Sequence, residues 1–404
     1  MLLRFLSRTN PLEDYYFYVP KICLQLMGFW PGASRTPRIR FWATFNFVLL
    51  LVGVVTELHA GFSCLSYDLE KALDTLCPAG TSAVTVLKMI LISYYHADLQ
   101  LVLKKMHEML YAYDEKEANH KLVHHRIIRN SSVMAARVNF APFLAGFITC
   151  TAYNLKPLVL AWIFWSKGKE LVWLTPFNMT MPKFLLEGPL YPLAYIFTAY
   201  TGYVTIFTFG GSDALYFEYC AHIATLLKML QADVKLLFRK FEDKLTLNTA
   251  EAAYVEEQLI LIIKRHNIII EMTDFFCKRY SIITLAHFVS ASMVIGASIF
   301  EMLTYNGFGR FIYLGYTVAA LSQLAVYCYG GTLVAENSIY LATVIFKCNW
   351  YICNPRLRRI VLMIIIRSQK SLSMSVPFFS PSMSTFASIL QTSGSIIALA
   401  SSFR

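Results

Sequence analysis

Long apolar runs with few charged residues constrain this chain more than any other feature. A helix that crosses a bilayer needs about 20 mostly apolar residues. The chain is 56% hydrophobic and only 15% charged, whereas an ordinary globular chain is about 25% charged. The sequence therefore predicts an all-α integral membrane protein, in contact with membrane lipid, that forms a single seven-helix membrane domain over residues 1–404. The predicted spans are Phe41–Leu58, Ala79–Leu103, Val133–Tyr153, Gly188–Phe217, Ser281–Thr304, Phe311–Val334 and Phe378–Phe403.

Basic residues alternate between the two sides of these spans. Of the 36 Lys and Arg residues, 28 fall before the first span or after the second, fourth and sixth. Because Lys and Arg concentrate in cytoplasmic loops, the N-terminus is predicted to be cytoplasmic and the C-terminus extracellular. This topology accounts for the net charge of +11, so the charge does not indicate a nucleic-acid partner.

The connection between the third and fourth spans is predicted to be extracellular. Pro157–Trp165 is apolar but too short to cross, and Trp162 and Trp165 suit an interfacial loop. The same connection carries the sequon Asn178-Met179-Thr180, which predicts glycosylation of Asn178.

Motifs that would indicate an enzyme, a metal site or a cofactor are absent from the sequence. The nine cysteines show neither CxxC pairs nor metal-type spacing. Cys64 and Cys77 share one predicted loop and can pair if that loop faces an oxidising compartment. We therefore expect no catalytic activity, no cofactor and no metal.

The predicted cytoplasmic side contains more helix than short connections need. Apolar residues recur at intervals of three and four over residues 222–245 and 255–270, and a third helix is predicted over 339–368. These segments define a predicted helical anchor region, 218–280 and 339–370. Their apolar stripes can pack on one another or dock neighbouring subunits, and the pattern does not choose between the two.

Charged residues inside membrane spans are candidates for function. The predicted spans or their ends contain Lys88, Asp98, Asp213, Glu301 and Glu336. Most lie near a helix end, where the side chain can reach the interface or a wet cavity. Lys88 fits this structural explanation least well.

The last predicted span, Phe378–Phe403, carries a stripe of hydroxyl groups. Ser388, Thr392 and Ser395 share one helix face with Leu399, because the spacing is four, three and four. The stripe can line a water-filled pore, in which Leu399 would form a hydrophobic gate. It can equally mark close packing of small residues between helices.

The C-terminal tail resembles the signature region of the insect odorant receptors. Gly331, Glu336, Ser338 and Trp350 match the start of that signature. Two departures are Ser371, where the family usually has Pro, and Gly394, where it usually has Tyr. The remaining matches are Pro355-Arg356, Arg367-Ser368-Gln369-Lys370, Thr385-Phe386, Ser388, Leu390, Thr392-Ser393 and Ser395.

This resemblance implies an odorant-binding subunit of a ligand-gated, non-selective cation channel. It implies a heterotetramer with a common coreceptor in the plasma membrane of olfactory sensory neuron dendrites, activated by small volatile apolar molecules. The loop after the fourth span is shorter than in the coreceptor, which indicates a tuning subunit. Leu399 and Phe403 align with the coreceptor's pore constriction. A gustatory-receptor-like channel that works without a coreceptor is the alternative.

In the family, the odorant site lies in the outer half of the second to sixth spans. The resemblance therefore implies a set of candidate ligand-binding residues on those spans. They are Tyr94, Phe143, Gly146, Phe147, Cys150, Tyr195, Ile196, Tyr200, Tyr313 and Tyr316.

Overall fold

The computed structural model describes residues 11–111, 118–168, 173–186, 189–304 and 309–402. Within these ranges the protein is helical, and its only β-type pairing is an isolated bridge between Val376 and Phe379. Two short 3₁₀ turns span Leu12–Tyr15 and Trp350–Ile352. The α-helices are α1 (Tyr18–Met27), α2 (Pro37–Cys64), α3 (Leu69–Tyr94), α4 (His96–Tyr111), α5 (Ala118–Ser166), α6 (Lys183–Leu186), α7 (Tyr191–Arg239), α8 (Thr249–Thr304), α9 (Gly309–Lys347), α10 (Pro355–Gln369) and α11 (Met383–Ser402).

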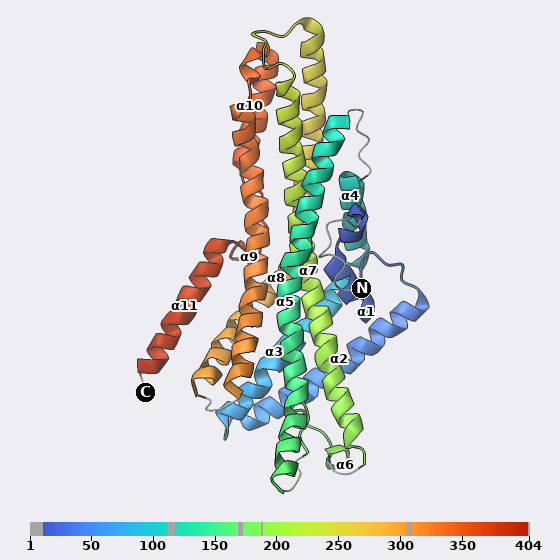
Figure 1. Cartoon of the computed structure of the whole chain (residues 1–404), viewed down its shortest axis with the longest axis vertical. Coiled ribbons are helices and arrows are strands. Elements are labelled where there is room, and N and C mark those ends of the chain that lie inside the picture. The colour runs from blue at the N-terminus through green and yellow to red at the C-terminus, as the bar shows by residue number, and fades with distance from the viewer. Residues whose placement is uncertain (1–10, 112–117, 169–172, 187–188, 305–308, 403–404) are drawn as a thin grey trace.

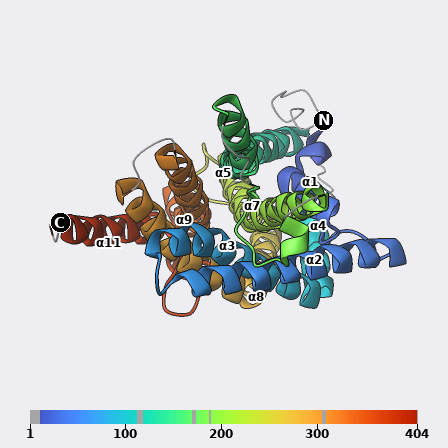
Figure 2. The ribbon, with the colours of Figure 1, turned by 90° about the horizontal axis from the view of Figure 1, so that it is seen from below.

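Five helices of the described chain are long and apolar enough to cross a membrane, namely α2, α3, α5, α8 and α9. The other two predicted spans correspond to α7 and α11. Figure 2 shows α7 in the middle of the bundle, with α11 standing apart. α7 is rich in Tyr and Thr, and the hydroxyls of Thr198, Thr201 and Thr205 donate to carbonyls one turn earlier in the same helix. These three hydroxyls are therefore satisfied within the helix itself.

Three predicted boundaries were wrong. The second predicted span bends at Tyr95, which separates α3 from α4. Residues 157–165 were predicted to form a loop, but they form the last turns of α5, because this helix continues through Pro157. The predicted helix over 339–368 is two helices, and Asn354 begins α10 by accepting a hydrogen bond from the Leu357 N–H at 2.9 Å.

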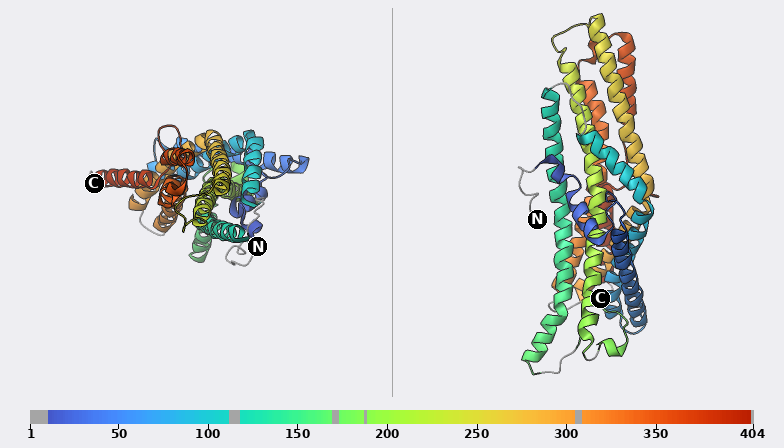
Figure 3. Two further views of the ribbon diagram at one scale, coloured as in Figure 1. Left: turned by 90° about the horizontal axis from the view of Figure 1, so that it is seen from above. Right: turned by 90° about the vertical axis from the view of Figure 1, so that its right-hand side faces the viewer.

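The anchor region extends well beyond the first turn of α5. Figure 3 shows this on the right, where the yellow and orange-red helices of the region continue past the start of the teal helix α5. A buried apolar cluster joins α7, α8, α9 and α10 there, so the predicted stripes pack within the chain. Apolar side chains nevertheless remain exposed on the outer face of α10, including Met363 (61%) and Ile366 (66%). The buried cluster includes Leu230, Val234, Leu237, Val255, Leu259, Ile262, Leu341, Ile345, Leu357 and Val361.

A second exposed apolar stripe follows α2. Its members recur at intervals of three and four, so they share one face of the helix. Phe41, Phe45, Val48, Val52 and Val55 are all between 42% and 74% exposed.

The last helix, α11, leaves the bundle after its first turns (Figure 1). At its start, the Met383 N–H donates to Thr332 Oγ1 of α9 at 3.0 Å. Gly331 allows this approach, because a β-carbon there would collide with the Pro381 carbonyl. Ser338, another residue of the signature, accepts a hydrogen bond from the Leu372 N–H at 2.9 Å. These signature residues therefore fix the segment that leads into α11.

Candidate ligand-binding site

A largely apolar cavity, partly open to its surroundings, lies between the helices. A mainly apolar wall with a few polar groups is typical of small-molecule binding sites. Four helices contribute side chains to the cavity at intervals of three or four residues. The stripes are Pro78, Thr81 and Ser82 on α3; Gly146, Thr149, Cys150 and Tyr153 on α5; Gly202, Thr205, Ile206 and Phe209 on α7; and Tyr316, Ala319, Ala320 and Gln323 on α9. α8 adds Ser290, Ala291 and Val294, and Phe177 from the connection after α5 completes the lining.

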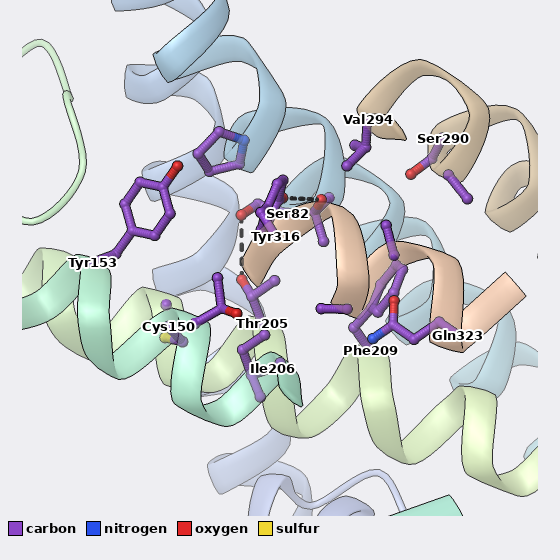
Figure 4. Close-up of a pocket in the computed structure, with 18 of the residues that line it drawn as sticks. Ser82, Cys150, Tyr153, Thr205, Ile206, Phe209, Ser290, Val294, Tyr316 and Gln323 are labelled. Atoms are coloured by element: carbon purple, nitrogen blue, oxygen red, sulfur yellow. Dashed lines mark hydrogen bonds between the residues drawn. The ribbon is translucent and has the colours of Figure 1, made fainter. Parts of the chain in front are cut away.

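Several hydroxyl groups in the cavity wall bond to one another or to backbone carbonyls. The Tyr316 and Thr81 hydroxyls are 2.7 Å apart, and those of Ser82 and Thr205 are 3.3 Å apart (Figure 4). The Gln323 side chain, by contrast, makes no hydrogen bond within the described part of the chain. It lies beside Phe209, at the opposite end of the cavity from Tyr153 (Figure 4). Gln323 is therefore available to bond to a ligand, as are the hydroxyls of Ser290 and Tyr153, which also make no hydrogen bond among the described residues.

Three of the ten candidate ligand-binding residues line this cavity, namely Gly146, Cys150 and Tyr316. Tyr94 lies elsewhere, at the end of α3, where it is 78% exposed, and Ile196 is 62% exposed. The other five candidates contact protein groups outside the cavity. The rings of Phe143 and Phe147 pack on Phe207. The Tyr195 hydroxyl donates a hydrogen bond to the Asn154 carbonyl. The Tyr200 hydroxyl donates to Asn46 Oδ1 and the Tyr313 hydroxyl donates to Asp74 Oδ1, both at 2.8 Å.

Most of the lining escaped the sequence-based candidates because these favoured aromatic residues. The wall consists instead largely of small and hydroxyl-bearing side chains. The sequence does show that these residues recur at intervals of three and four, so that each set shares one helix face. Examples are Gly202, Thr205 and Phe209 on α7, and Tyr316, Ala319 and Gln323 on α9. The pairing of these stripes across helices depends on the fold and could not be predicted from one sequence.

A second cavity, called the polar cavity because Glu57, Asp74 and Lys156 line it, adjoins the first. Pro78, Tyr153 and Phe177 line both cavities. The rings of Tyr153 and Phe177 stack with centroids 5.7 Å apart and planes inclined by 10°. This aromatic pair therefore separates the apolar cavity from a chamber that contains the charged residues Asp74 and Lys156.

Comparison with known proteins identifies the family. A family profile described as "7tm Odorant receptor" matches residues 68–394. The chain is 52% identical to odorant receptor 10a of Drosophila melanogaster, over 100% of this chain and 99% of that protein. This chain belongs to the odorant receptor family. It is also 34% identical to odorant receptor 24a of the same fly, with both chains covered completely.

The fold of this odorant receptor is also that of a solved relative. The olfactory receptor OR5 of Machilis hrabei, in complex with eugenol, superposes with a TM-score of 0.77 at 16% identity, covering 97% of this chain and 100% of that one. A shorter match is the odorant receptor coreceptor of Ooceraea biroi, which is 22% identical over 36% of this chain and 31% of that protein. The receptor is a multi-pass membrane protein related to tuning receptors along its whole length.

The candidate pore residues of this receptor lie on α11. Ser388, Thr392 and Ser395 are exposed. The Thr392 and Ser395 hydroxyls donate to carbonyls one turn earlier in the same helix, both at 2.9 Å. The Leu399 side chain and all of Phe403 lie outside what the structure describes. The pore assignment therefore remains a prediction.

Two further predictions concern the connections. Asn178 Nδ2 donates to Thr75 Oγ1 at 3.2 Å and the side chain lines the polar cavity, so glycosylation would require this contact to break. Cys64 and Cys77 form no disulfide, and Cys64 Sγ lies 3.2 Å from the Tyr67 hydroxyl.

Proposed function

We propose that this receptor is the odorant-binding subunit of a heteromeric, ligand-gated, non-selective cation channel. The observation that carries the proposal is an apolar cavity between the helices of a chain that matches odorant receptors along its whole length. The channel is a heterotetramer with the coreceptor in the plasma membrane of the olfactory sensory neuron dendrite. Lipid covers the exposed apolar stripe of α2.

The cavity selects small, uncharged ligands. None of the residues that line it is charged, so a charged ligand would lose its hydration without gaining an ionic partner. The apolar wall accommodates a hydrocarbon body, and Gln323 offers one hydrogen-bonding group at the end near Phe209. The ligand class is therefore a small volatile such as an ester, alcohol or aromatic compound. The relative from Machilis hrabei was solved with eugenol.

Assembly with other subunits accounts for two surfaces of the isolated chain. The outer face of α10 exposes Met363 and Ile366, and large exposed apolar patches commonly mark interaction sites. α11 stands apart from the bundle with Ser388, Thr392 and Ser395 exposed. In a tetramer, α10 docks neighbouring subunits and α11 lines a central pore, with Leu399 and Phe403 at its constriction.

Expression with and without the coreceptor tests this function. We expect odorant-evoked cation currents only when both subunits are present, because the pore requires α11 from each. A full odorant response from this chain alone would contradict the proposal and favour the gustatory-receptor-like alternative.

A further inference from the structure

Four polar side chains from four helices meet in the interior of the bundle. Lys88 Nζ of α3 donates to Asp213 Oδ1 of α7 at 2.5 Å, and the Tyr327 hydroxyl of α9 donates to the same oxygen at 2.8 Å. His287 of α8 stacks on the Tyr327 ring with centroids 4.3 Å apart. All four residues are at most 4% exposed. We call these four residues the polar cluster.

The cluster is incompletely bonded. Asp213 Oδ1 accepts two hydrogen bonds, whereas Oδ2 accepts none within the described structure. His287 Nδ1 lies 3.6 Å from Oδ2, and neither His287 nitrogen forms a hydrogen bond to the described residues. Because an N–H···O bond needs about 2.7 to 3.2 Å, a shift of less than about 1 Å would create one. A second arrangement, with His287 bonded to Asp213, is therefore within reach.

One side of the cluster touches the ligand cavity without forming part of its wall. Lys88 Nζ lies 3.4 Å from the centre of the Phe209 ring, and Phe209 lines the cavity. The Phe209 and His287 rings are 5.4 Å apart. Tyr327 also lies one helical turn beyond Gln323, which lines the cavity as well. A ligand that moves Phe209 therefore acts on the cluster.

The other side of the cluster leads to α11. The Tyr327 ring contacts Phe288, the neighbour of His287, with centroids 6.0 Å apart. Phe288 in turn contacts Phe379 at 4.7 Å, and α11 begins four residues later at Met383. A movement of α8 toward Asp213 would therefore carry Phe379 and the start of α11.

We infer that the polar cluster couples occupancy of the cavity to the position of α11, and so sets how strongly a bound ligand opens the channel. This inference rests on the proposed function. A ligand that displaces Phe209 weakens the contact between Lys88 and the Phe209 ring. It thereby destabilises the present arrangement, in which Asp213 is bonded to Lys88 and Tyr327. The alternative arrangement, in which His287 bonds to Asp213, is then favoured. Lys88, Asp213, His287 and Tyr327 act as positioning residues, because none of them lines the cavity.

Two variants that preserve the aromatic packing test this inference. Tyr327→Phe removes a hydrogen bond that holds the present arrangement, so basal current should rise and the half-maximal concentration should fall by one common factor for every agonist. His287→Phe removes the partner that Asp213 has in the alternative arrangement, so basal current should fall and the half-maximal concentration should rise. One hydrogen bond supplies a factor of about 2 to 10. Tyr216→Phe is the control, since its ring stacks on Tyr327 at 4.3 Å but its hydroxyl takes no part in the cluster.

The measurement is the ratio of basal to saturating current, together with concentration–response curves, at matched surface expression with the coreceptor. A purely structural role would lower all currents with surface expression and leave this ratio unchanged. Shifts of the same sign in Tyr327→Phe and His287→Phe, or no shift in either, would overturn the inference. A wild-type receptor that fails to respond at all would instead refute the proposed function.

Discussion

Gly146→Ala reduces the space for ligand with little disturbance of the empty receptor. An alanine β-carbon at position 146 would lie 3.5 Å from Ile206 Cδ1 and 3.9 Å from Gln323 Nε2, which are ordinary contacts. The methyl group therefore fits, but it occupies part of the cavity wall. A ligand that gives up one buried CH₂ loses roughly 0.8 kcal/mol, or about fourfold in affinity. A ligand that cannot shift faces an overpacking cost of about 1–3 kcal/mol.

The assay compares half-maximal concentrations for a series of agonists of increasing size, with the coreceptor present. We expect potency to fall about 4- to 100-fold for the bulkiest agonists and to change less than about 2-fold for the smallest. Gly296→Ala is the control, because it makes the same change in helix propensity on α8, and beyond the surrounding helix backbone no described atom lies within 4 Å of the new methyl group. An equal loss for all agonists, or the same size dependence in Gly296→Ala, would refute this location of the site.

Three further predictions concern the polar wall group, the aromatic pair and the pore. Gln323→Leu should lower potency about 2- to 10-fold for ligands with a hydrogen-bonding group and leave hydrocarbon ligands unaffected; equal effects on both classes would exclude Gln323 as a ligand contact. Phe177→Ala should speed both onset and decay of responses to rapid odorant pulses, because it opens the wall toward the polar chamber; unchanged kinetics would indicate another access route. Leu399→Ser should raise leak current without odorant, whereas Ile396→Ser, which the helical period places at the border of the hydroxyl stripe rather than in it, should impair packing or expression; unaltered basal currents in both, at matched surface expression, would remove Leu399 from the pore.

The sequence predicted the membrane spans well because each depends on a local run of apolar residues. It failed at Tyr95 and at Pro157, where tertiary packing decides whether a helix bends or continues. α5 continues through Pro157, since backbone groups freed by proline inside a membrane helix can be satisfied by their surroundings.

The candidate site was predicted only in part, because its lining residues come from five helices and the connection after α5. Gly146, Cys150 and Tyr316 were among the candidates, whereas Thr205 and Gln323 were not. The resemblance named the helices that line the cavity but not the faces that meet there.

The partner of Lys88 could not be predicted either. The sequence singled out both Lys88 and Asp213, but they lie 125 positions apart and only the fold brings them together. The structure therefore replaces an isolated charge with a buried ion pair. A buried ion pair by itself is weak evidence that a protein gains stability. The position of this pair, between the cavity and α11, therefore says more about function than its existence says about stability.

Chemical modification of Cys150 tests most directly whether odorants bind in the apolar cavity. Its side chain lines the cavity and is 5% exposed. A membrane-permeant methanethiosulfonate reagent should reduce odorant-evoked current, and a saturating odorant should slow this loss at least about tenfold by occupying the same space. Cys150→Ser should respond to odorant and resist the reagent. Modification that proceeds equally fast with and without odorant, a loss of current that persists in Cys150→Ser, or no reaction at Cys150 would contradict the account.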